Sequence, residues 1–441
     1  MLILGLILSV LLIVVGTSYW RIHPFLVLLF VSLFFGVWVR IPLGDLVERM
    51  QQGFGQTLGK IGLLVLMGVL IGTFLEKSGG AYQIAKSILR LTGLKKLPWA
   101  LSGLGFLIAI PVFVDAGFVL LQGLNRVLSR QAGVALVTTT TALAMGLMTS
   151  HCLIPPTPGP LAATGLLGAD MGLVLGFGVG IGLLAQIPTI LYSHWLGRSS
   201  ADMTLDARED HPTEVWSTTL PPLSKSLLPI GLPLVLIMAK SAIPAAYENA
   251  TWYPLLQFLG TPFIALGLGF LASLTLPAVL ERRVFSSEGW VGDAFRESSD
   301  ILLVTGAGGM FGFVLQSAHL GETLLDPEAM RGWGLWVPFG VAFLLKTVQG
   351  SSTVAMLTAA SLIAPLMPAL GLTSPVAVAL SVLAVGSGAI MVSHVNDSYF
   401  WVVTRLSGQT VSMGLRSHGI ASALTGVSAM LLCWVAWLVW G

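Results

Sequence analysis

Several ionisable side chains stand inside otherwise apolar stretches of this sequence, and helix-breaking or polar residues accompany them. The clearest cases are Asp115, His151, Lys346 and His394. A charged group in an apolar segment is costly, so it is expected to face a partner, a cavity or a transported ion. The two histidines can also titrate near neutral pH or hydrogen-bond a hydroxylated ligand. These residue types predict a buried site for a small polar molecule and a proton.

Asp115 lies in the segment AIPVFVDAGF, residues 109–118, where Pro111 removes a backbone donor and breaks the helix. We expect this carboxylate to face a cavity or a cation and to carry a coupling proton. The alternative is that Asp115 caps the helix expected over residues 118–128. Both roles can hold together.

Lys346 is the cation of the segment LLKTVQGSSTVAM, residues 344–356. A Gly-Ser-Ser turn that opens a helix presents free N–H groups and hydroxyls, which form an anion site. We expect this segment to bind the substrate carboxylate through Lys346, Gln349, Gly350, Ser351 and Ser352. The alternative for the lysine alone is that its ammonium reaches to the membrane interface.

Each of the two histidines precedes an interrupted segment. After His151 the run HCLIPPTPGP contains four prolines in six positions, so a continuous helix is excluded. Pro155 and Pro156 are expected, together with Pro111, to shape the cavity. The run SHVNDSYFW, residues 393–401, offers His394, Asn396 and Asp397 as successive polar groups. We expect His394 and these neighbours to contact the substrate's hydroxyl end. His151 is also expected to contact the substrate, in a first half that sets the shape of the cavity and the proton path. The alternative is that each histidine only packs.

Glu76, in LEKSGGA, is the remaining candidate acid. It ends an apolar run and Lys77 follows it, so two interpretations are open. The first is a role in proton coupling together with Asp115. The second is an ion pair with Lys77 at the surface.

The composition limits the class of protein that can position these groups. Of 441 residues, 55% are hydrophobic and 10% are charged, against about 25% charged in soluble domains. A soluble globule is therefore excluded. The net charge of +2 provides no basic field for nucleic acid, and two distant cysteines define neither a disulfide framework nor a metal site.

Apolar runs long enough to cross or enter a bilayer recur along the chain. They lie at about 2–19, 24–40, 59–76, 98–114, 133–150, 171–195, 227–243, 258–280, 299–317, 333–347, 353–371, 375–393 and 419–440. The predicted fold class is an all-α polytopic membrane protein. We read residues 2–19 as a retained first span and 197–226 as a polar linker outside the membrane.

An internal repeat organises these runs. LMTSH at 147–151 recurs as IMVSH at 390–394, 243 residues later. Phe54 corresponds to Phe295, and Glu76 to Gln316, at offsets of 241 and 240. The alternative is the general likeness of apolar helices. We predict a first repeat over 1–196 and a second over 227–441, with a central site at the interface between them, as in inverted-repeat transporters.

These motifs resemble the gluconate permease family of bacterial proton symporters. The matching stretches are EKSGGA (76–81), IPVFVDAGFVLL (110–121), SHCLIPPTPGP (150–160), KTVQGSSTVAM (346–356) and SHVNDSYFW (393–401). The resemblance implies two inverted repeats with re-entrant or unwound segments at a central anion site. It also implies an inner-membrane location and a homodimer in which a transport domain moves against a scaffold.

The chain departs from the family pattern at three positions. It has Val114 where the family has a second aromatic residue, Lys346 in place of arginine, and Thr157 in place of histidine. Lysine lacks the bidentate fork of arginine, so the choice of substrate within the family stays open. The missing histidine removes one titratable group from the usual set.

The predicted function is proton-coupled symport of gluconate or a related small sugar acid, with the bilayer as surroundings and no cofactor. A D-serine or other small hydroxy-carboxylate transporter of the same family is the closest alternative. A membrane-embedded hydrolase using Ser387 or Ser351 with His394 is a different class, but no nucleophile-elbow pattern supports an enzyme. An ion channel is a third possibility, without a visible filter motif.

Overall fold

The computed structural model describes residues 2–92, 96–199, 220–243, 247–317, 333–394 and 397–441, and the described secondary structure is helical throughout. The helices before the linker are α1 (Leu2–Val14), η1 (Val15–Tyr19), α2 (Pro24–Trp38), α3 (Leu43–Lys77), α4 (Gly80–Thr92), α5 (Leu97–Ile108), α6 (Val114–Ala132), α7 (Leu136–Leu153), α8 (Pro158–Leu167) and α9 (Met171–Ser199).

The helices after it are α10 (Leu223–Ala242), α11 (Tyr253–Leu259), α12 (Pro262–Ser273), η4 (Arg282–Phe285), α13 (Trp290–Ser317), α16 (Trp336–Gln349), α17 (Ser352–Ile363), η5 (Ala364–Leu366), α18 (Pro375–Ile390), α19 (Ser398–Leu406), α20 (Val411–Gly414), η6 (Leu415–Gly419) and α21 (Ile420–Trp440). The expected all-helical class is confirmed. Within the described ranges, five helices have the length and hydropathy to cross a membrane, or seven if each of two bent pairs is one span.

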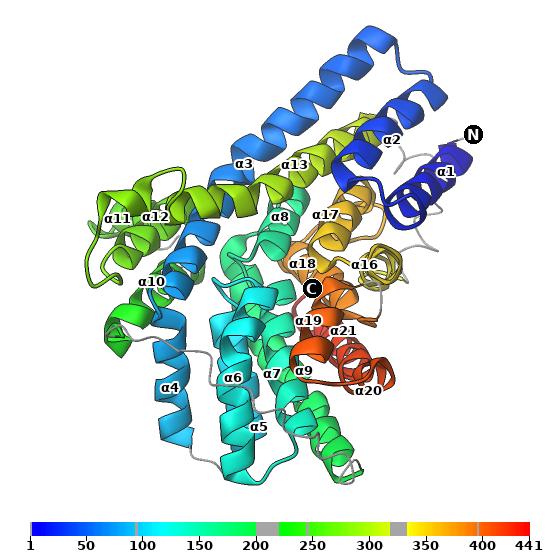
Figure 1. Ribbon diagram of the computed structural model, residues 1–441. Helices are drawn as coiled ribbons and strands as arrows, with labels where there is room; N and C mark the ends of the chain where they lie inside the picture. Colours follow the sequence, from blue (N-terminus) through cyan, green and yellow to red (C-terminus); the bar gives the residue numbers. More distant parts are fainter. Residues whose placement is uncertain (1, 93–95, 200–219, 244–246, 318–332, 395–396) are drawn as a thin grey trace.

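Two long helices, α3 and α13, lie side by side and join the two parts of the chain (Figure 1). Small residues permit this close approach, as is common between membrane helices. A Cβ added to Gly53 would lie 2.7 Å from the carbonyl oxygen of Gly309, and one added to Gly309 would collide with Thr57. Both helices begin earlier than the apolar runs at 59 and 299 predicted, because their first turns carry polar residues such as Asp45 and Asp293.

Four helix interruptions occur where the sequence predicted them. They separate α5 from α6 (109–113), α7 from α8 (154–157), α16 from α17 (350–351) and α18 from α19 (391–397). On each side of the linker a long helix thus precedes two interrupted pairs, and another long helix, α9 or α21, follows them.

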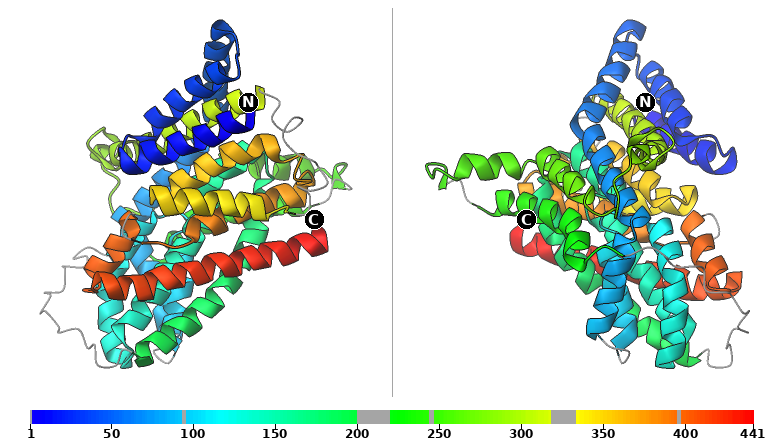
Figure 2. Two further views of the ribbon diagram at one scale, coloured as in Figure 1. Left: turned by 90° about the vertical axis from the view of Figure 1, so that its right-hand side faces the viewer. Right: turned by 60° about the vertical axis from the view of Figure 1, so that its left-hand side comes forward.

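Helix α7 runs through the middle of the molecule, and its residues from Val137 to Leu153 are all buried. It packs against α5, α9 and α18. The red helix of Figure 2, α21, packs against α18 and α9 and completes the packing around the interruptions of the second half. The interruptions consequently lie inside protein, where irregular backbone is tolerated.

Candidate functional site

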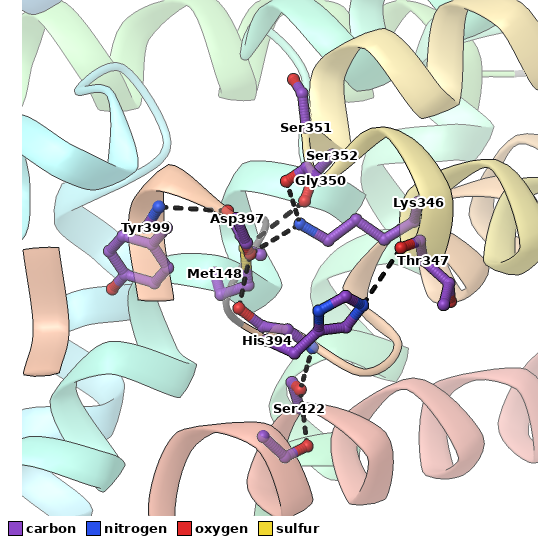
Figure 3. A network of polar contacts seen from close by, with 12 residues as sticks. Met148, Lys346, Thr347, Gly350, Ser351, Ser352, His394, Asp397, Tyr399 and Ser422 are labelled. Carbon is purple, nitrogen blue, oxygen red and sulfur yellow. Dashed lines mark hydrogen bonds and ion pairs between the residues drawn. The ribbon is translucent and has the colours of Figure 1, made fainter. Parts of the chain in front are cut away.

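Side chains from the two interruptions of the second half meet around a buried ion pair (Figure 3). The ammonium of Lys346, in the last turn of α16, lies 2.6 Å from Oδ2 of Asp397, which precedes α19. Both residues are nearly inaccessible, at 1% and 3% exposure. The pair therefore ties the break after α16 to the break before α19.

Further hydrogen bonds satisfy both members of this pair. The Lys346 ammonium also donates to the carbonyl oxygen of Gly350 at 2.8 Å, and the Ser393 hydroxyl donates to Oδ2 of Asp397. The other carboxylate oxygen accepts the backbone N–H of Tyr399 at 3.0 Å and so caps α19. A buried pair is stable only with such additional hydrogen bonds, and removing one partner costs about 3–5 kcal/mol.

This geometry changes two expectations from the sequence. Lys346 does not extend to the membrane interface, because its ammonium is held inside the protein. It also does not present an uncompensated charge to a ligand, because Asp397 neutralises it. Asp397 in turn is occupied as a helix cap and ion-pair partner rather than directed at hydroxyl groups. A ligand carboxylate would meet a neutral pair and the polar groups beside it.

The predicted Gly-Ser-Ser turn opens a helix. Gly350 ends α16 with φ 80°, a left-handed conformation that glycine adopts without steric cost. Ser351 is the N-cap of α17, and its hydroxyl accepts the N–H of Val354 at 3.4 Å. Beside the turn, both polar atoms of the Gln349 amide are buried without a hydrogen-bond partner among the described residues. The Gln349 amide thus differs from the ion pair beside it, whose polar atoms have partners in the described protein.

Asp115 lies in the first turn of α6, which begins at Val114, four residues before the helix that the sequence predicted. The N-cap is Phe113, so the expectation that Asp115 caps the helix is wrong in this form. A carboxylate in a first turn is nevertheless favoured by the helix dipole. Its Oδ1 atom is buried and accepts no hydrogen bond from the described part of the chain.

The two histidines occupy different surroundings. Nε2 of His151 lies 3.3 Å from the hydroxyl of Thr353 in α17, while its Nδ1 is buried with no partner in the described ranges. His394 lies 3.1 Å from the carbonyl oxygen of Thr347, which orients its ring. His151 therefore links the break after α7 to the start of α17. Asn396 lies outside the described residues.

The three prolines predicted to shape the cavity line one apolar pocket. Pro111, Pro155 and Pro156 face residues of α10 and α12 across it. Helix α3 passes directly behind the same two breaks: a Cβ on Gly68 would lie 2.9 Å from the carbonyl oxygen of Pro156, and one on Gly72 would collide with that of Pro111. These prolines thus form a packed boundary with α3 and α10.

Glu76 does not join the ion-pair cluster. It is half-buried in the last turn of α3, and it makes no hydrogen bond to the site residues that the structure describes. The neighbouring Lys77 pairs with Asp293 of α13. The expected surface pair between Glu76 and Lys77 is therefore replaced by a contact between the two long helices.

Some residues of the site carried no assignment from the sequence. The hydroxyl of Tyr399 donates to the carbonyl oxygen of Ala144 in α7 at 3.0 Å, and the Ser393 N–H donates to Ser422 of α21 at 2.9 Å. Val392 has φ 43°, a strained conformation for a β-branched residue. His418 is buried behind Tyr399, with ring centroids 5.2 Å apart. The signal for His418 was its Ser-His dipeptide, which repeats the pattern at 150–151 and 393–394.

The serines named for a hydrolase make other contacts. The Ser387 hydroxyl donates to the carbonyl oxygen of Leu383, and that of Ser351 caps α17. Among the described residues, no cluster of three or more metal-ligating side chains occurs.

Comparison with known proteins decides the family. The model of the family described as GntP family permease matches residues 1–439. The chain belongs to this family. The resemblance to gluconate permeases inferred from the motifs is thereby confirmed, and the family is one of multi-pass membrane transporters.

Individual relatives agree. The chain is 29% identical to the gluconate permease of Zymomonas mobilis, over 98% of this chain and 97% of that protein. It is 31% identical to the D-serine transporter DsdX of Escherichia coli, over 96% of each. Its fold is similar to the crystal structure of the Alcanivorax borkumensis YdaH transporter, with a TM-score of 0.69, 16% identity, and coverage of 95% of this chain and 99% of that chain.

Proposed function

We propose that this permease is a secondary active transporter that carries gluconate or a related small sugar acid into the cell together with protons. The observation that carries the proposal is the buried Lys346–Asp397 pair at the interrupted helices of a chain that belongs to the GntP family. The family name and the gluconate permease relative support the substrate class. The apolar helices are consistent with the inner membrane of a bacterium.

The architecture of the proposal is two inverted repeats, predicted at 1–196 and 227–441, joined by a polar linker. The linker is shorter than the predicted range 197–226, because α9 ends at Ser199 and α10 begins at Leu223. The support for the two repeats is the matching order of long helix, two interrupted pairs and long helix on each side. Gly68 and Gly72 of α3, which face the proline breaks, let α3 approach these breaks closely. In the proposal this contact lies between a scaffold and a moving unit. A homodimer, which the resemblance implies, completes this picture.

In this mechanism the substrate carboxylate binds at the start of α17. The N–H groups of the first turn, the hydroxyl of Ser352 and the amide of Gln349 would surround it, because helix N-termini favour anions. The neutral Lys346–Asp397 pair holds the turn in place. The hydroxyl end of the substrate would extend toward His394. His151 contacts Thr353 at the start of the same helix.

Charge balance explains the coupling. The Lys346–Asp397 pair is neutral, so an ionised Asp115 leaves the cluster with one negative charge, and an anionic substrate would add a second. A proton on Asp115 removes that repulsion, and by linkage the bound anion favours the proton equally. Substrate and proton are then carried together.

The test is uptake of radiolabelled gluconate by the purified protein in proteoliposomes. With an acidic exterior we expect accumulation above the outside concentration, abolished by a protonophore. Uptake that only equilibrates the two sides under the same gradient would contradict proton coupling. Absence of gluconate exchange would contradict the substrate class.

D-serine is the second candidate substrate, and the relative DsdX is the observation that favours it. A zwitterion brings its own ammonium group, which could compensate Asp115 without a proton. Competition of labelled gluconate by unlabelled D-serine distinguishes the two. Stronger competition by D-serine than by gluconate would reverse the order of the candidates.

A further inference from the structure

Buried polar residues continue from the site along α6, away from its break. Starting from the half-buried Asp115, the buried residues Gln122, Asn125 and Ser129 follow at helical spacing on one face of this helix. Gln122 and Asn125 are 4% and 0% exposed. From Asp115 to Asn125 the helix rises about 15 Å. A polar stripe on a buried helix face is costly unless its members have partners.

Helices α7 and α19 provide the facing side of this stripe. The Asn125 amide donates to Thr140 of α7 at 3.1 Å and to Oε1 of Gln122 at 3.0 Å. One helical turn further along α7, the carbonyl oxygen of Ala144 accepts the Tyr399 hydroxyl. The Tyr399 N–H is itself bonded to Asp397. The stripe is thereby connected with the ion pair of the site.

A second row of polar residues begins at His418, whose ring packs against that of Tyr399. His418 lies in the π-helical turn η6, a distortion that frequently marks functional sites. Its neighbour Ser417 donates to Oε1 of Gln409 at 2.6 Å, and Gln409 is adjacent to the exposed Gly408. From α6, Arg126 donates to the carbonyl oxygen of Leu406 in the same region. The polar stripe of α6 and the row that begins at His418 therefore both end near residues 406–409.

Several atoms along the stripe and the row are buried and accept or donate no hydrogen bond within the described chain. They are Nε2 of Gln122, Oδ1 of Asn125, Oγ1 of Thr141 and both ring nitrogens of His418. The contrast with Gln186 is informative, because this equally buried glutamine of α9 has both amide atoms bonded, to Ser102 and to the carbonyl oxygen of Gly182. Orphaned polar atoms that cluster in one place indicate bound water.

We propose that these residues, here called the polar column (Gln122, Asn125, Thr140, Thr141, Tyr399, Ser417 and His418), hold a chain of water molecules that conducts protons between Asp115 and the surface near Gln409. His418 can accept a proton at one ring nitrogen and release it from the other, so its charge is restored after each transfer. The charged or titratable groups acting on the column around Tyr399 and His418 are Asp115, Cys152, Lys346 and Asp397. The inference rests on the proposed proton coupling and assigns its route.

The first experiment tests for water and needs no transport. Hydroxyl radicals generated from water by an X-ray pulse modify side chains next to bound water even when they are buried. We expect modification of Tyr399 and His418, which are 2% and 1% exposed. The controls are Met430 and Phe311, both 0% exposed, which should stay unmodified although methionine is highly reactive. Protection of Tyr399 and His418 to the level of these controls would overturn the water chain.

The second experiment tests proton conduction with Gln122→Met and Asn125→Leu, which keep side-chain volume and remove the polar atoms. Gln186→Met is the matched control. In proteoliposomes, we expect gluconate accumulation driven by a pH gradient to fall about tenfold or more in both column variants. Gluconate counterflow, which needs no net proton movement, should stay within about twofold of wild type and so report folding.

The outcomes separate the route from the function. Coupled accumulation in wild type that persists in both column variants would overturn the column and leave the proposed function intact. Accumulation and counterflow that fall together, in the column variants as in Gln186→Met, would reduce the column to a structural role and overturn it as well. Counterflow without accumulation in wild type would contradict proton coupling itself.

Discussion

The interrupted helices of the two halves follow the same order, yet the charged groups at their breaks differ in how they are paired. In the second half, Lys346 and Asp397 satisfy one another and are completed by Gly350, Ser393 and the N–H of Tyr399. In the first half, Oδ1 of Asp115 and Nδ1 of His151 are both buried without a hydrogen-bond partner in the described part of the chain.

The difference separates two tasks that a coupled transporter must perform. A neutral, fully bonded pair gives rigidity but gains little from a change of protonation. A carboxylate with an unsatisfied oxygen can change its charge without dismantling the fold. We therefore interpret the ion pair of the second half as the support for the substrate site and Asp115 of the first half as the group that takes up the proton. The following predictions test this division, beginning with the largest effect.

Removing one member of the pair should have the greatest effect. Lys346→Ala leaves Asp397 buried without a counter-charge, and we expect a loss of about 3–5 kcal/mol of stability. Thermal unfolding in detergent measures it. Lys346→Arg keeps the charge and should be milder. The double variant Lys346→Met with Asp397→Asn removes both charges and should regain part of the stability without regaining uptake. Equal stability of Lys346→Ala and wild type would contradict the claim that the ion pair stabilises the second half.

Asp115→Asn should separate coupling from binding. The asparagine keeps the shape and removes the titratable group, so uptake against a gradient should be lost while counterflow is at least partly retained. Proteoliposome uptake with and without a pH gradient measures both. If the variant still concentrates gluconate, the first half does not carry the proton at this residue.

Gln349→Met should affect binding and stability in opposite directions. Its buried amide lacks a partner in the described protein, so replacing it with an apolar side chain of similar length should leave the unfolding temperature unchanged or slightly higher. A lost hydrogen bond of about 0.5–1.5 kcal/mol to the substrate would weaken gluconate affinity by up to about tenfold. Unchanged affinity, measured by titration calorimetry, would remove Gln349 from the site.

The smallest effect concerns the backbone before Asp397. Val392 holds a left-handed φ of 43°, a conformation that costs a non-glycine residue about 1–2 kcal/mol. In Val392→Gly the relief of this strain should offset the lost side chain, leaving stability within about 1 kcal/mol of wild type. The control Val385→Gly, in the buried middle of α18, should cost more than about 2 kcal/mol. Similar losses in both variants would show that the strain at Val392 is not significant.

The sequence by itself determined the helices and where they are interrupted. Pro111 and the prolines after His151 lack backbone donors, and Gly350 permits a left-handed turn, so these three breaks follow from local chemistry that holds in any fold. The apolar runs likewise predicted the cores of α2, α7, α9 and α21. The lengths of α3 and α13 were underestimated, because their polar first turns extend beyond the apolar segments.

Only the tertiary structure decided how the polar groups are paired. Lys346 and Asp397 are 51 residues apart, and no local pattern indicates that the lysine's charge is neutralised by that carboxylate rather than by a ligand. The same holds for Lys77, which contacts Asp293 and not its neighbour Glu76. The role of His418 depends on Tyr399 and on the buried face of α6, which the chain brings together only when it is folded. Charge compensation depends on distance in space, and a sequence specifies that distance only through the packing of all its helices.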